Sequence, residues 1–333
     1  MKPDITIVIP GAGRPQFLTC LLESIQRQTA VDRIAEIIVS EDSGNRESMN
    51  VAAKFKKLPI RYAFRSPSLG FLGHHRVLLC EEARTPLTAL LHDDDWWAPH
   101  HLETACSALD HDPACAVCFA NIYDSFGPQY PMEIKHHNGV WRAWVAAGCP
   151  CDANVVKLDL TGALLASLVE VTFHFSTMVG RSRAVAEAFL EVEATKNGYD
   201  CDRTFPAFLA ERGTISYAMT PSAFIRIHAR QESRRIQERQ DGLVLKLATT
   251  RWMLKHWPRE ASEAVARFNA TAATMDPAIL SYVSAMTGEP LKSCLIDECG
   301  FNLARDLPGS RVKQLLKQCT PPVFVALWRR LIS

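Results

Sequence analysis

The sequence lacks three features that would indicate a membrane, secreted or nucleic-acid-binding protein. No uncharged apolar run approaches the roughly 18 residues of a membrane-spanning helix. A β-branched run at residues 5–9 follows the first residues with no small-residue cleavage site, so we expect no signal peptide and a cytoplasmic protein. An excess of charge is also missing, because 37 Lys and Arg against 36 Asp and Glu leave a formal net charge of +1. This balance argues against broad nucleic-acid binding and leaves room for one anionic ligand in one site.

Internal repeats and low-complexity stretches are absent, and the cysteines do not suggest disulfides. The 11 cysteines are odd in number, and most stand in apolar surroundings, which favours reduced, buried thiols. Cys115 and Cys118 form a CxxC pair inside an apolar strand-like run, so we do not interpret them as zinc ligands. A length of 333 residues fits two domains, or one large domain with an appendage.

The first half of the chain alternates strand-like and helix-like segments. Short apolar runs predict strands at residues 5–9, 34–39, 60–64, 87–91 and 114–123. Apolar residues at helical spacing predict helices at residues 15–28, 50–57, 71–84 and 99–110. This alternation predicts an α/β fold with a mostly parallel sheet and helices on both faces. Ligands of such sheets bind beyond the carboxyl ends of the strands, and polar clusters follow Pro10, Val39 and Leu91 at those ends.

The character of the sequence changes near residue 232. Residues 238–256 and 259–274 predict helices with no strand between them, so we expect an α/β domain at 1–232 and a helical region at 233–333. The tail at 307–333 is basic and carries Trp328 among apolar residues. Such a segment can lie on an anionic membrane surface, and the simpler alternative is a helix docked on its own domain.

Three adjacent carboxylates, Asp93, Asp94 and Asp95, directly follow a strand that is predicted to be buried. Neighbouring carboxylates repel one another, and their burial is costly without a cation. Mg²⁺ or Mn²⁺ would resolve the conflict, because both prefer oxygen ligands. The alternative is a solvated acidic turn.

Gly11 and Gly13 follow the first strand and suggest a dinucleotide-binding turn. Position 16, where the third glycine of that fingerprint belongs, holds Gln16, so a nicotinamide site is a remote alternative. Glu41, at the end of the second strand, can bind the ribose or the base edge of any nucleotide.

Several segments in order resemble family 2 glycosyltransferases. The resemblance covers about residues 4–233 and is carried by residues 5–10, 14–15, 24–29, 36–44, 70, 76, 92–99, 199–202, 210–213 and 225–228. It implies a GT-A fold, a nucleotide-diphospho-sugar donor (most simply a UDP-sugar), a divalent metal, and inversion at the anomeric carbon.

The resemblance also implies roles for individual residues. Residues that would bind the donor are Pro10, Arg14, Glu41, Asp42, Arg76, His92, Asp93 and Arg226. Metal ligands would be Asp94, Asp95 and His228. The family's D-x-D motif fits either His92 and Asp94 or Asp93 and Asp95; we prefer the first, in which His92 replaces the usual aspartate.

Asp202 matches the family's catalytic base by counting back from Gly213. Cys201 stands where the family has a Glu, and Asp200 is a plausible substitute. The alternative role for Asp200 and Asp202 is an acidic pair that favours a helix N-terminus. Residues 173–177 resemble the stretch before the acceptor site, although a core segment would explain their aromatic side chains equally well. The histidine doublets at 74–75, 100–101 and 136–137 are expected on the surface, with His74 or His75 a possible exception near the donor.

These observations favour an inverting enzyme that transfers a sugar to a glycan or lipid-linked acceptor, as in polysaccharide or cell-envelope synthesis. The enzyme would act in the cytoplasm or at the cytoplasmic face of a membrane. The main alternative is an inactive protein that binds a nucleotide-sugar or serves as a scaffold, since His92 and Cys201 depart from the family pattern. A nicotinamide-dependent oxidoreductase is the remote alternative.

Overall fold

A computed structural model describes residues 2–126, 133–136, 154–168, 173–195, 201–228, 231 and 241–274. Within these residues one sheet holds ten strands: β1 (Ile5–Gly11), β2 (Ile34–Glu41), β3 (Ile60–Phe64), β4 (Leu87–Leu90), β5 (Trp96–Trp97), β6 (Cys115–Phe126), β7 (Glu133–His136), β8 (Val155–Leu158), β9 (Val179–Arg181) and β10 (Thr214–Ile227). The α-helices are α1 (Pro15–Gln26), α2 (Glu47–Ala52), α3 (Gly70–Arg76), α4 (His101–His111), α6 (Leu160–Leu168), α7 (Ser182–Ala194), α8 (Cys201–Ala210), α10 (Asp241–His256) and α11 (Pro258–Ala272). Short 3-10 helices lie at Val31–Arg33 and Phe175–Thr177, and a π-helix at Val77–Glu82 continues α3.

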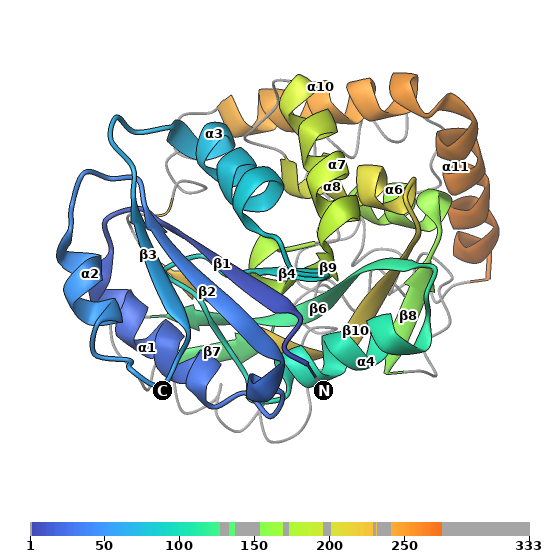
Figure 1. Ribbon diagram of the computed structural model, residues 1–333. Helices are drawn as coiled ribbons and strands as arrows, with labels where there is room; N and C mark the ends of the chain where they lie inside the picture. Colours follow the sequence, from blue (N-terminus) through green and yellow to red (C-terminus); the bar gives the residue numbers. More distant parts are fainter. Residues whose placement is uncertain are drawn as a thin grey trace, which may run out of the picture.

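The strand order β3-β2-β1-β4-β9-β6-β10-β5 makes a mixed, mostly parallel sheet (Figure 1). Strands β3, β2, β1 and β4 pair in parallel, as do β6 and β10, while β9 runs antiparallel to both β4 and β6. Pro10 pairs with Ser40 and Gly11 with Glu41, so β1 and β2 end side by side. The predicted α/β architecture and the gathering of polar clusters at one edge of the sheet are confirmed.

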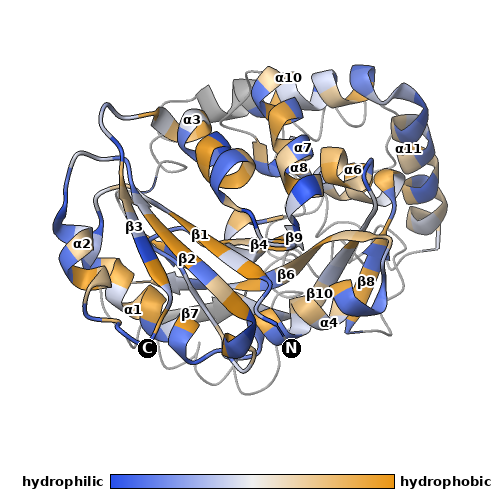
Figure 2. Cartoon of the chain, viewed as in Figure 1, coloured by the Kyte–Doolittle hydropathy of each residue, from blue (hydrophilic) through white to orange (hydrophobic). Residues whose placement is uncertain are grey.

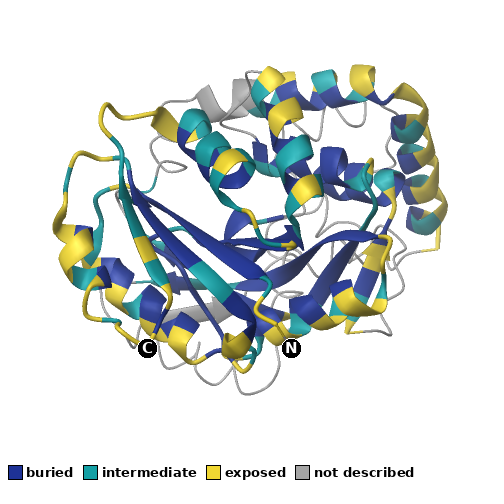
Figure 3. Ribbon diagram, in the orientation of Figure 1, coloured by how far each residue is buried: buried dark blue, intermediate teal, exposed yellow. Residues whose placement is uncertain are grey.

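Helices cover both faces of the sheet because each presents an apolar stripe to it (Figures 1 and 2). On one face, α1 and α4 pack Leu18, Leu21, Leu102 and Leu109 against the strands. The opposite face forms a second core with α6, α7 and α8, and every residue of β1 between these layers is buried (Figure 3).

The C-terminal helices join this second core. Met253 of α10, Trp257 at the junction of the two helices, and Ala264 and Phe268 of α11 belong to the same buried cluster as side chains of α6 and α8. Whether residue 232 divides two domains stays a prediction, and the basic tail at 307–333 lies outside the described residues. Among the described residues, no helix is both long and apolar enough to cross a membrane.

Two local expectations differ from the structure. The helix predicted at 50–57 is the shorter α2, and the one predicted at 71–84 divides into α3 and the π-helix. The surface location expected for the histidine doublets is wrong for His74, His75 and His101, which are 4%, 3% and 1% exposed. Their helices turn these imidazoles inward, where each makes a hydrogen bond: His74 with Ser40, His75 with the Phe71 carbonyl and His101, through Nδ1, with Ser222.

Candidate active site

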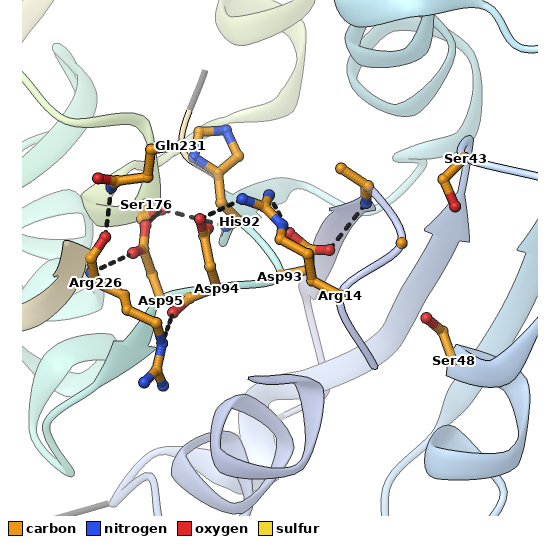
Figure 4. Close-up of polar contacts among 12 residues, drawn as sticks. Arg14, Ser43, Ser48, His92, Asp93, Asp94, Asp95, Ser176, Arg226 and Gln231 are labelled. Carbon is orange, nitrogen blue, oxygen red and sulfur yellow. Dashed lines mark hydrogen bonds and ion pairs between the residues drawn. The ribbon is translucent and has the colours of Figure 1, made fainter. Parts of the chain in front are cut away.

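The loop that follows β4 carries the acidic cluster Asp93–Asp95 into the protein rather than into solvent. The three residues are 3%, 6% and 3% exposed, so the alternative of a solvated acidic turn is wrong. Figure 4 shows their carboxylates fanned out toward different partners. Each carboxylate therefore has its own electrostatic surroundings.

Arg14, on the loop between β1 and α1, bridges two of these carboxylates. Its Nη2 donates to Asp93 Oδ1 and its Nη1 to Asp94 Oδ2, while the Ala12 backbone N–H donates to Asp93 Oδ2 at 2.9 Å (Figure 4). Burial raises the pKa of Asp93 to about 6, against the opposing charge of Arg14. Burial also works to raise the pKa of Asp94, but hydrogen bonding by His228 and the charge of Arg14 prevail and lower it to about 2. Asp94 is thus the carboxylate held firmly in its charged form.

Asp95 points away from Arg14. Its Oδ2 accepts a hydrogen bond from Ser176 Oγ at 2.5 Å, and its Oδ1 accepts one from the Arg226 backbone N–H at 2.9 Å (Figure 4). Burial and the neighbouring charge of Asp94 raise the pKa of Asp95 well above its usual value. Asp95 therefore ties the loop to two distant segments of the chain.

Arg226 fixes the acidic loop from behind. Its guanidinium lies 4.3 Å from the Phe17 ring centroid and 4.7 Å from that of Trp96, and its Nε donates to the Asp94 carbonyl at 2.8 Å. The side chain is 1% exposed. The structure therefore places Arg226 as a support of the loop and not at a surface where a donor would meet it.

His228 approaches the same carboxylate that Arg14 holds. Its Nε2 lies 3.0 Å from Asp94 Oδ2, and its ring packs against Phe17 at 5.1 Å between centroids. Residues far apart in the sequence thus meet at Asp94.

Glu41 and Asp42 lie at the end of β2, beside this cluster. Both carboxylates already accept hydrogen bonds from other residues of the chain. Glu41 is fully buried and accepts hydrogen bonds from the Gly13 N–H at 2.9 Å, the Ser43 N–H at 3.1 Å and Ser48 Oγ at 2.7 Å. Asp42 accepts from the backbone N–H groups of Leu69 and Gly70 and from Ser68 Oγ, at the start of α3. Their carboxylates therefore shape the rim of the site.

The comparisons with known proteins agree with this geometry. The family model described as Glycosyl transferase family 2 matches residues 6–162, which include β1, β2, β4 and the acidic loop. Over these residues the chain therefore resembles glycosyl transferase family 2. No curated protein sequence matches it.

Similar solved structures share the GT-A fold of this chain. Staphylococcus aureus TarS aligns with a TM-score of 0.53 and 12% identity, covering 86% of this chain and 50% of TarS. This chain thus spans about half the length of that protein. The TarS 1–349 complex with UDP-GlcNAc aligns with a TM-score of 0.51 and 10% identity, covering 89% of this chain and 92% of that one. The mannosyltransferase PcManGT from Pyrobaculum calidifontis, in complex with GDP-Man and Mn²⁺, aligns with a TM-score of 0.53 and 14% identity over 90% and 80% of the two chains.

Asp94 and His228 could together hold a divalent ion. Two ligands bound at about 2.1 Å and at right angles lie about 3.0 Å apart. This matches the 3.0 Å between Asp94 Oδ2 and His228 Nε2. A carboxylate held in its charged form and an imidazole nitrogen both suit Mn²⁺.

A second cluster, His92, Asp95 and His174, fits an ion less well, although its potential ligand atoms lie within 4.8 Å of one another. His174 Nδ1 accepts a hydrogen bond from the Ser176 N–H at 3.2 Å. In a neutral ring this places the proton on Nε2, so His174 offers no lone pair to an ion. His92 Nε2 lies instead 3.4 Å from Nε2 of the buried His75, beside the acidic loop.

The remaining residues expected in the site fall in three places. Pro10, in β1, stands beside Ser40 at the sheet edge, close to the cluster. Arg76 is turned toward Glu81 and Glu193, with ion pairs of 2.6 and 3.6 Å. Asp202 lies in the first turn of α8 and is partly buried, and Asp200 falls outside the described residues.

Three residues that contact the site were not assigned to it from the sequence. Ser176 and Ser48 hold Asp95 and Glu41, and His75 pairs with His92. The sequence signalled only that residues 173–177 mattered and that His75 was a possible exception among the doublets. A single serine in a short helix carries no local sign of the carboxylate that it will bind.

Proposed function

We propose that this protein transfers a sugar, with inversion, from a nucleotide-diphospho-sugar to an acceptor hydroxyl, assisted by a divalent metal. The observation that carries the proposal is the meeting of Asp94 and His228 at the carboxyl ends of the central strands. The resemblance to family 2 supplies the reaction class. The buried, charged carboxylate of Asp94 supplies a place where a cation and a diphosphate can be held together.

Two neighbours support a nucleotide-diphospho-sugar donor. The TarS structure holds UDP-GlcNAc, and PcManGT holds GDP-Man with Mn²⁺. For this chain we propose a UDP-sugar first, with the loops of Pro10, Glu41 and Asp42 forming the rim around the nucleoside. Because Glu41 is held by Gly13, Ser43 and Ser48, its role would be to shape that rim.

The proposed metal would be held by Asp94 and His228. It would supply positive charge that stabilises the leaving diphosphate. Arg226 and Asp95 would keep the acidic loop in place through contacts that the apo protein already makes. This assignment uses the D-x-D register with His92 and Asp94, because Asp94 is the carboxylate that faces His228.

Asp202 would take the proton from the acceptor hydroxyl as its oxygen attacks the anomeric carbon. The bond from that carbon to the diphosphate oxygen breaks as the new glycosidic bond forms, so configuration inverts and no covalent enzyme intermediate is needed. A carboxylate in the first turn of a helix is favoured in its charged form by the helix dipole, which suits a base. Asp200 remains the alternative base.

The acceptor would be a glycan or a lipid-linked saccharide, reached at the cytoplasmic face of a membrane. This part of the proposal depends on the basic composition of residues 307–333. It predicts binding to anionic liposomes that weakens with salt. Unchanged binding after deletion of 307–333 would contradict it.

The first experiment is a thermal-shift screen of nucleoside diphosphates with and without Mn²⁺ or Mg²⁺, on the wild type and Asp94→Asn. A ligand that binds the native state raises the unfolding midpoint by mass action. A metal-dependent shift with one nucleotide, lost in Asp94→Asn, would support the proposal. No shift with any nucleotide in folded protein would contradict it. Nucleotide-sugar binding without donor hydrolysis or transfer would instead favour the inactive binding protein, in line with the departures at His92 and Cys201.

A further inference from the structure

The acidic cluster is neutralised unevenly among the described residues. Arg226 touches the cluster through its backbone N–H and through the carbonyl of Asp94, with its guanidinium packed against Phe17 and Trp96. Arg14 instead places one nitrogen on the carboxylate of Asp93 and another on that of Asp94. Arg14 is therefore the arginine that acts as counterion to these two carboxylates.

Arg14 is held much more loosely than Arg226. It lies on a loop just before α1, next to Gly13 with its φ of 75°, and its side chain is 15% exposed. Its Nε has no hydrogen-bond partner among the described residues. Its guanidinium can leave the two carboxylates by side-chain rotation, whereas Arg226 is locked inside the core.

Arg14 and the proposed ion would compete for one atom. Asp94 Oδ2 accepts from Arg14 Nη1 and also lies 3.0 Å from His228 Nε2. An ion bound to Oδ2 would repel a guanidinium on the same oxygen, because like charges at this distance in a partly buried site repel strongly. Two carboxylates and a divalent ion would balance in charge, and Arg14 would become a surplus cation.

We propose that Arg14 is an exchangeable counterion: the metal displaces it from Asp94, and the freed guanidinium binds the diphosphate of the donor. The inference rests on the proposed donor site. A planar guanidinium binds phosphate oxygens through paired N–H donors, and its unpartnered Nε adds a third. Metal and nucleotide then bind cooperatively, since the nucleotide supplies the new partner that displaced Arg14 needs.

The proposed exchange predicts that Arg14→Met changes Mn²⁺ affinity and UDP affinity in opposite directions. In Arg14→Met, Mn²⁺ alone binds at least about tenfold more tightly, because its competitor is gone. In the same variant, UDP binding at saturating Mn²⁺ weakens about tenfold, because one phosphate ligand is gone. A merely structural Arg14 would weaken both.

The experiment measures free Mn²⁺ by electron paramagnetic resonance while the full chain is titrated, without and with UDP, and in parallel with GDP. Arg14→Lys keeps the charge but lacks the paired donors, so its Mn²⁺ affinity falls between wild type and Arg14→Met. Arg33→Met is the matched control, because Arg33 also bridges two aspartates, Asp4 and Asp110, outside the site. Arg33→Met lowers the unfolding midpoint and leaves the affinities for Mn²⁺ and for UDP unchanged.

The outcomes separate the two proposals. A folded Arg14→Met that binds Mn²⁺ no more tightly than the wild type overturns the exchange, even if UDP binding persists. Should Arg14→Met unfold, the same comparison is made with Arg14→Lys, and unchanged Mn²⁺ affinity there overturns the exchange. Failure of the wild type to bind any nucleotide with either metal contradicts the proposed donor site itself.

Discussion

Arg226 donates through Nε to the backbone carbonyl of Asp94 at 2.8 Å, across 132 positions of sequence. The bond joins the end of β10 to the loop after β4, which carries the proposed metal ligand. The rings of Phe17 and Trp96 both pack against the guanidinium. Asp94 is therefore placed by a residue that has no need to touch donor or metal.

Arg226→Met should lower both stability and metal affinity. It leaves the buried Asp94 carbonyl without its donor, at about 1–3 kcal/mol, and removes the two cation–π contacts, at about 1–2 kcal/mol more. The backbone N–H that binds Asp95 remains, so the loop is loosened on one side only. Denaturant unfolding and Mn²⁺ titration check this.

Arg226→Lys is the matched variant, since it keeps the positive charge and loses the planar stack. We expect Arg226→Lys to show most of the loss of stability and metal affinity that Arg226→Met shows. A lysine variant with wild-type stability and metal affinity would show that charge alone matters and that the ring contacts do not place Asp94.

Glu41 should contribute to stability without any nucleotide present. Ser48→Ala removes one of its hydrogen bonds and should lower the free energy of unfolding by about 1 kcal/mol. Glu41→Gln turns an amide N–H toward groups that also donate, Gly13 N–H, Ser43 N–H or Ser48 Oγ, and should cost about 2–3 kcal/mol. Unfolding of the ligand-free variants measures both. If Glu41→Gln unfolds like the wild type and only nucleotide binding suffers, Glu41 serves the ligand directly.

The parts of the site that the sequence predicted are those encoded locally. The buried strands β1, β2 and β4 show as short apolar runs, and the polar residues directly after them must lie at one sheet edge. The acidic triplet can be recognised in the sequence because three adjacent carboxylates cannot be buried without partners.

The parts that it did not predict depend on contacts between distant segments. The ring contacts of Arg226 join residues 17, 96 and 226, and Ser176 meets Asp95 from another strand connection. The buried histidines were misplaced because a doublet on an amphipathic helix has no signal for which face turns inward. His75 packs against Phe175 and Phe189, which come from distant segments. His101 stacks on Trp97, and neither set of contacts has a local signal in the sequence.

Asp202→Asn should separate chemistry from binding. Loss of the base should lower the rate of donor hydrolysis, in which water is the acceptor, about 10²- to 10⁴-fold. Affinity for UDP with Mn²⁺ should stay within about twofold, because the amide keeps the size of the side chain. Steady-state rates and isothermal titration measure the two quantities.

Asp200→Asn is the matched variant, two positions earlier in the sequence. If Asp202 is the base, Asp200→Asn retains most of the hydrolysis rate. The reverse ranking would assign the base to Asp200, and equal small effects in both variants would reduce the pair to helix-terminal acids.

Buried His101 should make the fold sensitive to acid. Burial, with a smaller contribution from His100, lowers the pKa of His101 from 6.5 to about 3. The ring stacks on Trp97 at 4.5 Å, binds Ser222 through Nδ1 at 2.8 Å, and its Nε2 has no partner among the described residues. The unfolded state binds the proton more readily than the folded state, so this contribution is fully present above pH 6.5 and is lost as the pH falls toward 3. At pH 5 the loss is about 2 kcal/mol.

His101→Gln removes this titration while keeping a polar side chain near Ser222. At pH 7.5 the variant should be less stable than the wild type, because the stack on Trp97 is lost. The difference should shrink by about 2 kcal/mol on going to pH 5, since only the wild type takes up the destabilising proton on unfolding. The exposed His111 provides the control, and His111→Gln should run parallel to the wild type across this range. Denaturant unfolding at several pH values makes the measurement, and a constant difference between wild type and His101→Gln would show that His101 is not kept neutral by its burial.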